Sequence, residues 1–277
     1  MNTMNMMNRM KRTLVAARWL SLLGLSIALL FCTMVASPQS AEPKPAAVPA
    51  PLADGTPDLS GLWTRLRDKG ATQRGYLSFI LDFNQVVAPM TPWAAEKFKK
   101  TNAMYHGADA KTVLSDPIFR CEPPGVPRIY LMNFPVQIVQ IPGQVLMLFE
   151  YDHFIRRIFT DGRPHDLDQG PLWMGDTTGK WEGDTLIADT VGFNDKTLID
   201  RVGHLHSDAM HIVERIRRLD HDTLEIEFTI DDPKAYKQSW GTKLVFQLRP
   251  DWKIMENVCE DNASFVDFNK KAVQGLK

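Results

Sequence analysis

Several common signatures of function are missing from this 277-residue sequence. It has no G-x-G-x-x-G loop and no regular strand–helix alternation, so nothing favours a Rossmann or TIM-barrel fold. It has no G-x-S-x-G elbow, so serine-hydrolase machinery is not visible. Its 32 basic and 33 acidic residues nearly cancel, and a chain without a basic surface is not expected to bind nucleic acid. Nothing indicates a nucleotide, a flavin or another cofactor.

The first forty residues have the organisation of a secretory signal. Residues 1–18 carry basic residues and no acid, an apolar run follows, and small residues come next. We expect residues 1–41 to be a cleaved signal peptide of a periplasmic or secreted protein, with an uncleaved membrane anchor as the alternative. Residues 42–56, rich in proline and alanine, are expected to form a tether. The remainder, 57–277, is expected to form a single domain.

Cysteine is scarce. The three residues Cys32, Cys121 and Cys259 are too few and too scattered for a zinc finger or an iron–sulfur framework. Two of them remain after signal removal, and in an oxidising compartment such a pair is more often joined than free. We therefore expect a Cys121–Cys259 disulfide, with two buried thiols as the alternative.

Helical patterning is confined to one segment. Thr91 and Pro92 supply an N-cap and a first helical residue before good helix formers, which predicts a helix over about 91–103. After Pro135 the chain shows short β-rich runs separated by turn residues, as in antiparallel hairpins. These runs are 136–141, 145–151, 154–159, 185–191, 211–219, 223–230, 243–248 and 254–259.

So many short strands predict an all-β fold. An antiparallel meander that closes into a β-barrel is the expected architecture, because closure hides the strand edges. A β-sandwich is the alternative. One helix and long N-terminal loops would complete the domain.

The strand register of the hairpin around residues 220–222 can be predicted from its sequence. A three-residue loop places charged pairs on one face and apolar pairs on the other, namely Arg217 with Glu225, Arg215 with Glu227, Ile216 with Ile226 and Ile212 with Ile230. The charged pairs are expected to form an ion-pair ladder that faces water. The same register places Glu214 opposite Phe228 on the apolar side, where an unpaired carboxylate is costly.

Histidines concentrate in one part of the chain. Six of the seven fall between His153 and His221. His165 lies in the loop TDGRPHDLD with Asp161 and Arg163, residue types that suit proton transfer and the holding of an anionic or carbonyl oxygen. An ordinary polar turn is the alternative for this loop.

The segment HLHSDAMH brings His204, His206 and His211 close together in sequence. Zinc is the first ligand to consider, but HExxH is missing and no pair of histidines has helical i,i+4 spacing. We therefore expect no metal site. His206 is interpreted as a proton carrier and His211 as a residue that lines a pocket.

Further residues are candidates for contact with a ligand. A tight turn would bring Glu150 and His153 together as an acid–base couple. The alternative is a polar pair at the end of a hairpin that has no catalytic role. Tyr151 and Tyr236 could donate hydrogen bonds to a ligand, with simple packing as the alternative. Trp173 completes the set of expected ligand contacts.

Near the start of the domain, Gly61-Leu62-Trp63 is similar to the G-x-W motif of lipocalin and related calycin barrels. The resemblance implies a calycin-like barrel. In those barrels the tryptophan covers a closed end against an arginine from a late strand, and Arg249 is the position matched to it.

A second resemblance covers most of the chain after the tether. Its motifs resemble the recurrent motifs of a family of exported bacterial proteins of unknown function. They are Asp58-Leu59-Ser60-Gly61, CEPPGVPR at 121–128, Asp161-Gly162-Arg163 with His165, WEGDTLIADT at 181–190, Gly192-Phe193-Asn194, Glu214-Arg215 and Asp232-Pro233. This resemblance implies an exported β-rich protein and carries no established activity.

These residues together predict an exported enzyme that performs cofactor-independent acid–base chemistry on a small, partly apolar molecule, by isomerisation, dehydration or elimination. His165 or His206 would carry the proton and Glu214 would act as base or orient the imidazole. Arg163, beside Asp161, would hold the developing oxyanion. A periplasmic carrier of a hydrophobic molecule is the alternative, and a metal-dependent hydrolase the third. The oligomeric state is left open.

Overall fold

The computed structural model describes residues 47–66, 89–103, 116–200 and 202–261. The predicted signal peptide lies outside these residues, and the predicted tether lies only partly within them. Among the described residues, no helix has the length and apolar character needed to cross a membrane.

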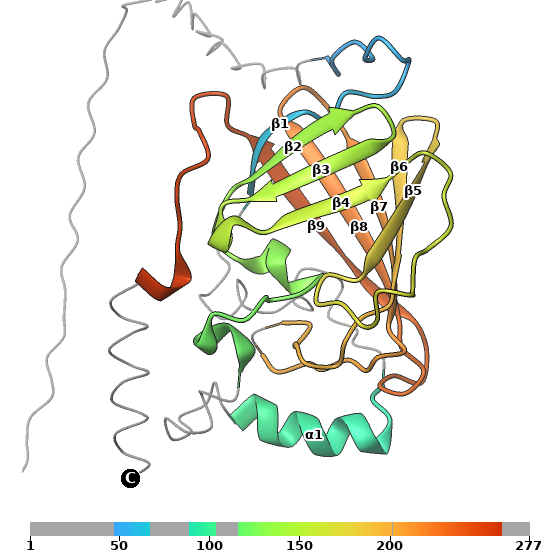
Figure 1. The fold of residues 1–277 in the computed structure, drawn as a ribbon, viewed down its shortest axis with the longest axis vertical. Helices are drawn as coiled ribbons and strands as arrows, with labels where there is room; N and C mark the ends of the chain where they lie inside the picture. The colour runs from blue at the N-terminus through green and yellow to red at the C-terminus, as the bar shows by residue number, and fades with distance from the viewer. Residues whose placement is uncertain (1–46, 67–88, 104–115, 201, 262–277) are drawn as a thin grey trace, which may run out of the picture. The chain divides into compact units, whose positions relative to one another are not determined.

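Nine strands close into a barrel in sequence order (Figure 1). They are β1 (Gly61–Arg65), β2 (Val136–Ile141), β3 (Gln144–Phe149), β4 (Ile155–Phe159), β5 (Asp176–Glu182), β6 (Thr185–Val191), β7 (His211–Arg218), β8 (Thr223–Asp231) and β9 (Trp240–Leu248). The prediction of an all-β barrel is confirmed, and β9 pairs with β1 to close it.

All junctions between the nine described strands are antiparallel except one. Strands β4 and β5 run parallel and share a single paired position, Phe159 with Thr178. The expectation of an entirely antiparallel meander is wrong here, because residues 160–175 are not a hairpin: they carry the chain back to the barrel end at which β4 begins. We call this junction the β4–β5 seam.

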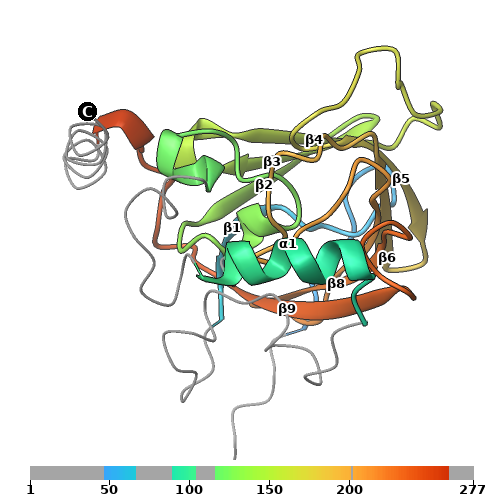
Figure 2. The same ribbon diagram turned by 90° about the horizontal axis from the view of Figure 1, so that it is seen from below.

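The predicted helix is α1 (Pro92–Ala103). Its N-cap is Thr91, whose Oγ1 accepts a hydrogen bond from the Ala94 amide at 3.3 Å. The helix packs against the loops that follow β6 and β8, because the Thr91 amide donates to the Ala235 carbonyl and the Thr101 hydroxyl to the Gly203 carbonyl. Figure 2 views the barrel from this end, with α1 in front.

The Cys121–Cys259 disulfide is present, with the two Cα atoms 5.6 Å apart. It joins the short 3-10 helix η2 (Pro117–Arg120) to η5 (Cys259–Asp261), so it ties the chain before the main run of strands to the chain after it. The predicted pairing is confirmed.

The predicted strand at 254–259 is wrong. Strand β9 already pairs with β1, so the closed barrel has no free edge for another strand. The segment is held instead by side chains: the Met255 amide donates to Glu150 Oε2 at 2.9 Å and the Cys259 amide to Asp152 Oδ1 at 3.1 Å.

Strands β7 and β8 pair in the predicted register, including Glu214 opposite Phe228. On the outer face Arg217 forms the expected ion pair with Glu225, at 3.3 Å. The rest of the expected ladder is wrong, because Arg215 Nη1 faces Glu182 Oε2 of β5 at 3.5 Å. The long side chain of Arg215 thus reaches across β6 to a strand that does not pair with β7.

Trp63 of β1, the tryptophan of the G-x-W motif, is completely buried. The guanidinium that lies over its ring, 5.0 Å from the ring centre, belongs to Arg218. Arg249, the residue matched to this role by resemblance, stacks on Trp252 instead. Arg218 takes the role because it shares the inward side of β7 with Ile216, two residues earlier.

Candidate functional site

The site begins with a buried carboxylate inside the barrel. Glu214 has no exposed surface, as its inward position on β7 predicted. Its partner is Arg156 of β4, whose Nη1 donates to Glu214 Oε1 at 2.8 Å and whose Nη2 donates to Oε2. Sequence reasoning missed Arg156, although its spacing of two from the buried Ile158 was a signal that it points inward.

Three hydroxyl groups complete this interior network. Arg156 Nη2 donates to Thr190 Oγ1 at 2.9 Å and to Thr177 Oγ1 at 3.3 Å, and Nη1 donates to the Tyr130 hydroxyl. Burial raises the pKa of Tyr130 well above its ordinary value, so the phenol is neutral. Burial lowers the pKa of Arg156, but the interactions with Glu214 and Tyr130 together outweigh it, so the pKa rises and the guanidinium stays a cation.

The remaining donor of Arg156 is unpaired. Among the described residues its Nε has no hydrogen-bond partner and is buried. Leaving such a donor unsatisfied costs about 1–3 kcal/mol, so an acceptor that reached it would bind favourably.

Arg156 also lines a cavity of about 240 Å³ at the β4–β5 seam, which we call the seam cavity. Its walls are mixed. The apolar side chains include Ile155, Leu172 and Met174, and the polar ones include Arg157, Gln169 and Asp176.

A second network lies at the edge of this cavity. His165 Nδ1 is 2.8 Å from Asp176 Oδ2 and its Nε2 is 3.0 Å from Asp189 Oδ1. His211 Nε2 is 3.0 Å from the other oxygen, Asp189 Oδ2. We call these four residues the histidine–aspartate cluster. Because an ionised carboxylate only accepts, each contact of His165 requires a hydrogen on the ring nitrogen.

The two networks lie on opposite sides of the barrel wall. Thr177 and Thr190 contact Arg156 inside, while the adjacent residues Asp176 and Asp189 contact His165. Alternation along a strand therefore puts the histidine–aspartate cluster on the outer face. Asp176 lines the seam cavity together with Arg156, so both networks contribute to its wall.

The predicted loop residues Asp161 and Arg163 form an exposed ion pair, with Arg163 Nε 2.9 Å from Asp161 Oδ1. This hydrogen bond lowers the pKa of Asp161, which stays ionised. The Arg163 guanidinium lies 4.0 Å above the ring of Phe159, and Phe159 lines the seam cavity. Of the five predicted catalytic residues, His165 and Glu214 are thus bonded to residues that line the seam cavity, and Arg163, paired with Asp161, stacks on another.

The fifth, His206, belongs elsewhere. Its Nδ1 is 3.0 Å from the Ser207 carbonyl, and its Nε2 is 2.7 Å from Thr197 Oγ1. Because a carbonyl only accepts, Nδ1 carries the hydrogen and Nε2 accepts from the Thr197 hydroxyl. The expectation that His206 trades protons with Glu214 is not met, because both Glu214 oxygens are bonded to Arg156.

His206 is expected to contribute to acid sensitivity. Burial lowers its pKa below the ordinary 6.5, so on acidification the unfolded chain takes up this proton before the folded one does. Stability is therefore lost as the pH falls below about 6.5. Urea unfolding at about pH 7.5 and about pH 5.5 should show a smaller loss for His206→Gln than for the unchanged protein. His221→Gln, at an exposed histidine, is the control, and equal losses in both variants would contradict the expectation.

The expected Glu150–His153 couple is not formed. Glu150 is buried and accepts a hydrogen bond from the Met255 amide. His153 is exposed and has a positive φ of 57°. That backbone turn directs the two side chains to different surroundings, so the pairing expected from a simple tight turn is wrong.

The aromatic residues predicted to contact a ligand contact other residues of the protein instead. The Tyr236 hydroxyl donates to the Leu205 carbonyl at 2.9 Å. Tyr151 is buried against Phe134, with ring centres 5.4 Å apart. Trp173 lies near the ammonium of Lys196, at 5.6 Å, outside the seam cavity.

The three clustered histidines of the sequence separate in space. His204 Nδ1 contacts Asp200 Oδ2 at 2.8 Å, whereas His206 contacts Thr197 and His211 belongs to the histidine–aspartate cluster. Over the part of the chain that the structure describes, no group of three or more histidine, cysteine, aspartate or glutamate residues is arranged to hold a metal ion.

No family model matches the chain, and no curated protein matches it significantly. The proposal for its function therefore rests on the geometry described above.

Proposed function

We propose that this protein is an exported enzyme that performs acid–base chemistry at the β4–β5 seam, on a small, partly apolar molecule that carries a carbonyl or carboxylate oxygen. One observation carries the proposal. The seam cavity is lined both by Asp176, which holds His165, and by Arg156, whose buried Nε lacks a partner. Asp176, the partner of the proposed proton carrier, and Arg156, the proposed oxyanion donor, thus both contribute to the wall of one cavity.

Each residue has a distinct role in this proposal. His165 takes a proton from the carbon next to a carbonyl, and the electron pair moves to the carbonyl oxygen, which the Arg156 Nε hydrogen stabilises. Return of the proton to another carbon completes an isomerisation, and loss of a neighbouring leaving group completes an elimination. Glu214 is a positioning residue, since it holds the guanidinium of Arg156.

For His165 to act as a base, its contact with Asp189 must open and the Nε2 hydrogen that this contact requires must pass to solvent, which frees the Nε2 lone pair to take the substrate proton. The side chain of Asp189 is 40% exposed, against 11% for Asp176. Asp189 is also shared with His211. The substrate is therefore proposed to replace Asp189 at Nε2, while Asp176 keeps the ring in place through Nδ1.

A carrier without catalysis is the second candidate. The barrel interior is occupied by side chains, among them the ring of Tyr130 against Phe228 and Phe246. A carried ligand would therefore use the same seam cavity, where Leu172 and Met174 supply apolar contact. Catalytic turnover of a substrate would distinguish the enzyme from the carrier.

The test is exchange of carbon-bound hydrogen for deuterium, followed by NMR in heavy water. The probes are small 2-oxo acids and cyclic ketones, which report proton abstraction without knowledge of the natural product. We expect the protein to accelerate exchange for one of these classes, and His165→Gln to lower that rate about 100-fold or more. His221→Gln should keep the full rate. Exchange at the buffer rate, or an unchanged rate in His165→Gln, would overturn the enzyme proposal.

A further inference from the structure

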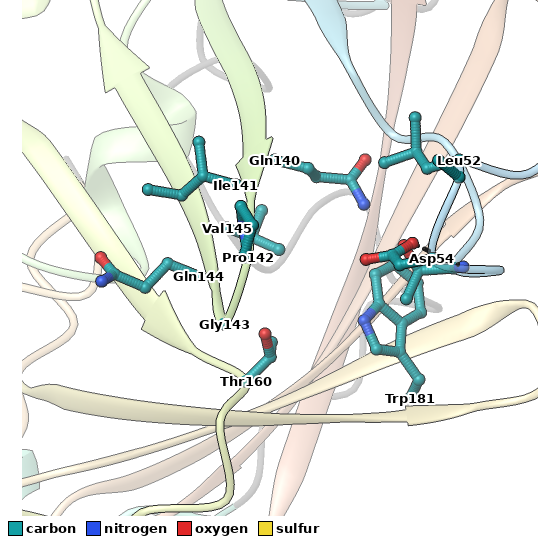
Figure 3. Close-up of a pocket in the computed structure, with 12 residues that line it drawn as sticks. Leu52, Asp54, Gln140, Ile141, Pro142, Gly143, Gln144, Val145, Thr160 and Trp181 are labelled. Atoms are coloured by element: carbon teal, nitrogen blue, oxygen red, sulfur yellow. Dashed lines mark hydrogen bonds between the residues drawn. The ribbon is translucent and has the colours of Figure 1, made fainter.

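A second cavity, of about 330 Å³, shares no lining residue with the seam cavity. It lies between the turn that joins β2 to β3, at Pro142 and Gly143, and the segment Leu52–Thr56 (Figure 3). Trp181, the first residue of the WEGDT motif, supplies part of its wall. We call it the Trp181 cavity.

We propose that the Trp181 cavity binds a small amphipathic organic cation, an ammonium group attached to an apolar body. The proposal is independent of the seam and of the reaction proposed there.

The charge of the cavity favours a cation. Asp54 is an acidic lining residue, and none of the described residues that line the cavity is basic. Asp54 Oδ1 accepts hydrogen bonds from the Thr56 amide at 3.0 Å and from the Thr56 hydroxyl at 2.6 Å. These bonds lower the pKa of Asp54, so the carboxylate is charged at neutral pH.

The aromatic and apolar walls favour an ammonium group with a hydrophobic part. Trp181 is half-buried and its indole lines the cavity, and an indole face is the best aromatic partner for a cation. Leu52, Ile141 and Val145 offer apolar surface to the rest of the molecule. In Figure 3 Leu52, Asp54 and Trp181 lie across a gap from Val145.

The cavity is built on a fixed frame. Gln140 Nε2 donates to the Pro57 carbonyl at 3.0 Å, and its Oε1 accepts from the Leu59 amide at 2.6 Å, so this amide fastens the N-terminal segment to β2. The Leu52 amide donates to the Thr56 carbonyl at 2.9 Å and closes the turn that carries Asp54. Both polar ends of Gln140 are thus used by the protein, which leaves Asp54 as the charged recognition group.

Three probes of one shape and different charge test the proposal. Benzyltrimethylammonium, benzyl alcohol and benzoate are titrated separately into the full chain by calorimetry. We expect the cation to bind most tightly. Asp54→Asn, which keeps the oxygen that accepts from Thr56, should weaken cation binding about fivefold and leave the neutral probe unchanged. Trp181→Leu should weaken both probes.

Asp251→Asn removes another exposed carboxylate and serves as the matched control. It should bind the cation as the unchanged protein does, and circular dichroism checks that each variant is folded. Equal affinity for all three probes, no binding of the cation, or cation binding unaffected by both Asp54→Asn and Trp181→Leu would each overturn the proposal.

Discussion

Replacement of Glu214 by leucine is expected to lower the free energy of unfolding by about 3–5 kcal/mol, because it leaves the charge of Arg156 buried without a counter-charge. Both side chains are almost completely removed from water. Arg156 cannot relieve the cost by losing its proton, since a guanidinium stays charged. Urea unfolding followed by circular dichroism measures the change.

The double variant Arg156→Met, Glu214→Leu is the decisive comparison. It removes both charges and keeps similar volume, so it should recover most of the stability that the single variant loses. Glu227→Leu, at an outward position on the same hairpin, should change stability by about 0.5 kcal/mol or less. If the double variant loses as much as the sum of the losses in Glu214→Leu and in Arg156→Met, each measured singly, the two side chains are not coupled and the buried pair is misassigned.

Loss of the Cys121–Cys259 disulfide should have a comparable effect. The two residues are 138 positions apart. Chain entropy then gives a stabilisation of about 5 kcal/mol, lessened by residual structure in the unfolded chain. The variant Cys121→Ala, Cys259→Ala should unfold at a much lower urea concentration than the oxidised protein.

Reduction of the unchanged protein provides the control for this variant. Reductant should lower its stability to near that of the double alanine variant, and should leave the variant itself unaffected. A loss below about 1 kcal/mol on reduction would show that the bond does not constrain the unfolded chain as proposed.

The β7–β8 hairpin shows what could be predicted from the sequence. A period of two in apolar residues and a three-residue loop sufficed to set its register. The inward position of Glu214 followed from that register. Its partner did not, because the distance in space between Arg156 and Glu214 depends on barrel closure, which a local pattern does not encode.

Strand β5 shows why other parts were missed. Its inward positions are Thr177, Gly179 and Trp181, which form no aliphatic pattern. Gly179 is required there by close packing, since a Cβ atom would lie 2.6 Å from Cγ2 of Ile158. The strand therefore lacks the alternation on which strand prediction relies.

The candidate site was only partly visible in the sequence. The loop residues Asp161, Arg163 and His165 were recognised by type, but Asp176 and Asp189 were not. Their contact with His165 depends on the path of residues 160–175 back along the barrel, and no sequence rule sets such a path. His206 was grouped with Glu214 because the two are near in sequence, whereas the loop that carries His206 folds toward Thr197.

The single paired position between β4 and β5 bears on how a molecule could reach the buried guanidinium. A cup-shaped barrel admits its ligand through an open end, but here the ring of Tyr130 packs against Phe228 in the interior. With only Phe159 and Thr178 paired, few backbone hydrogen bonds hold the two strands together along their length. In the proposed enzyme the substrate would therefore enter laterally, between these two strands, and small movements of the strands would control its entry.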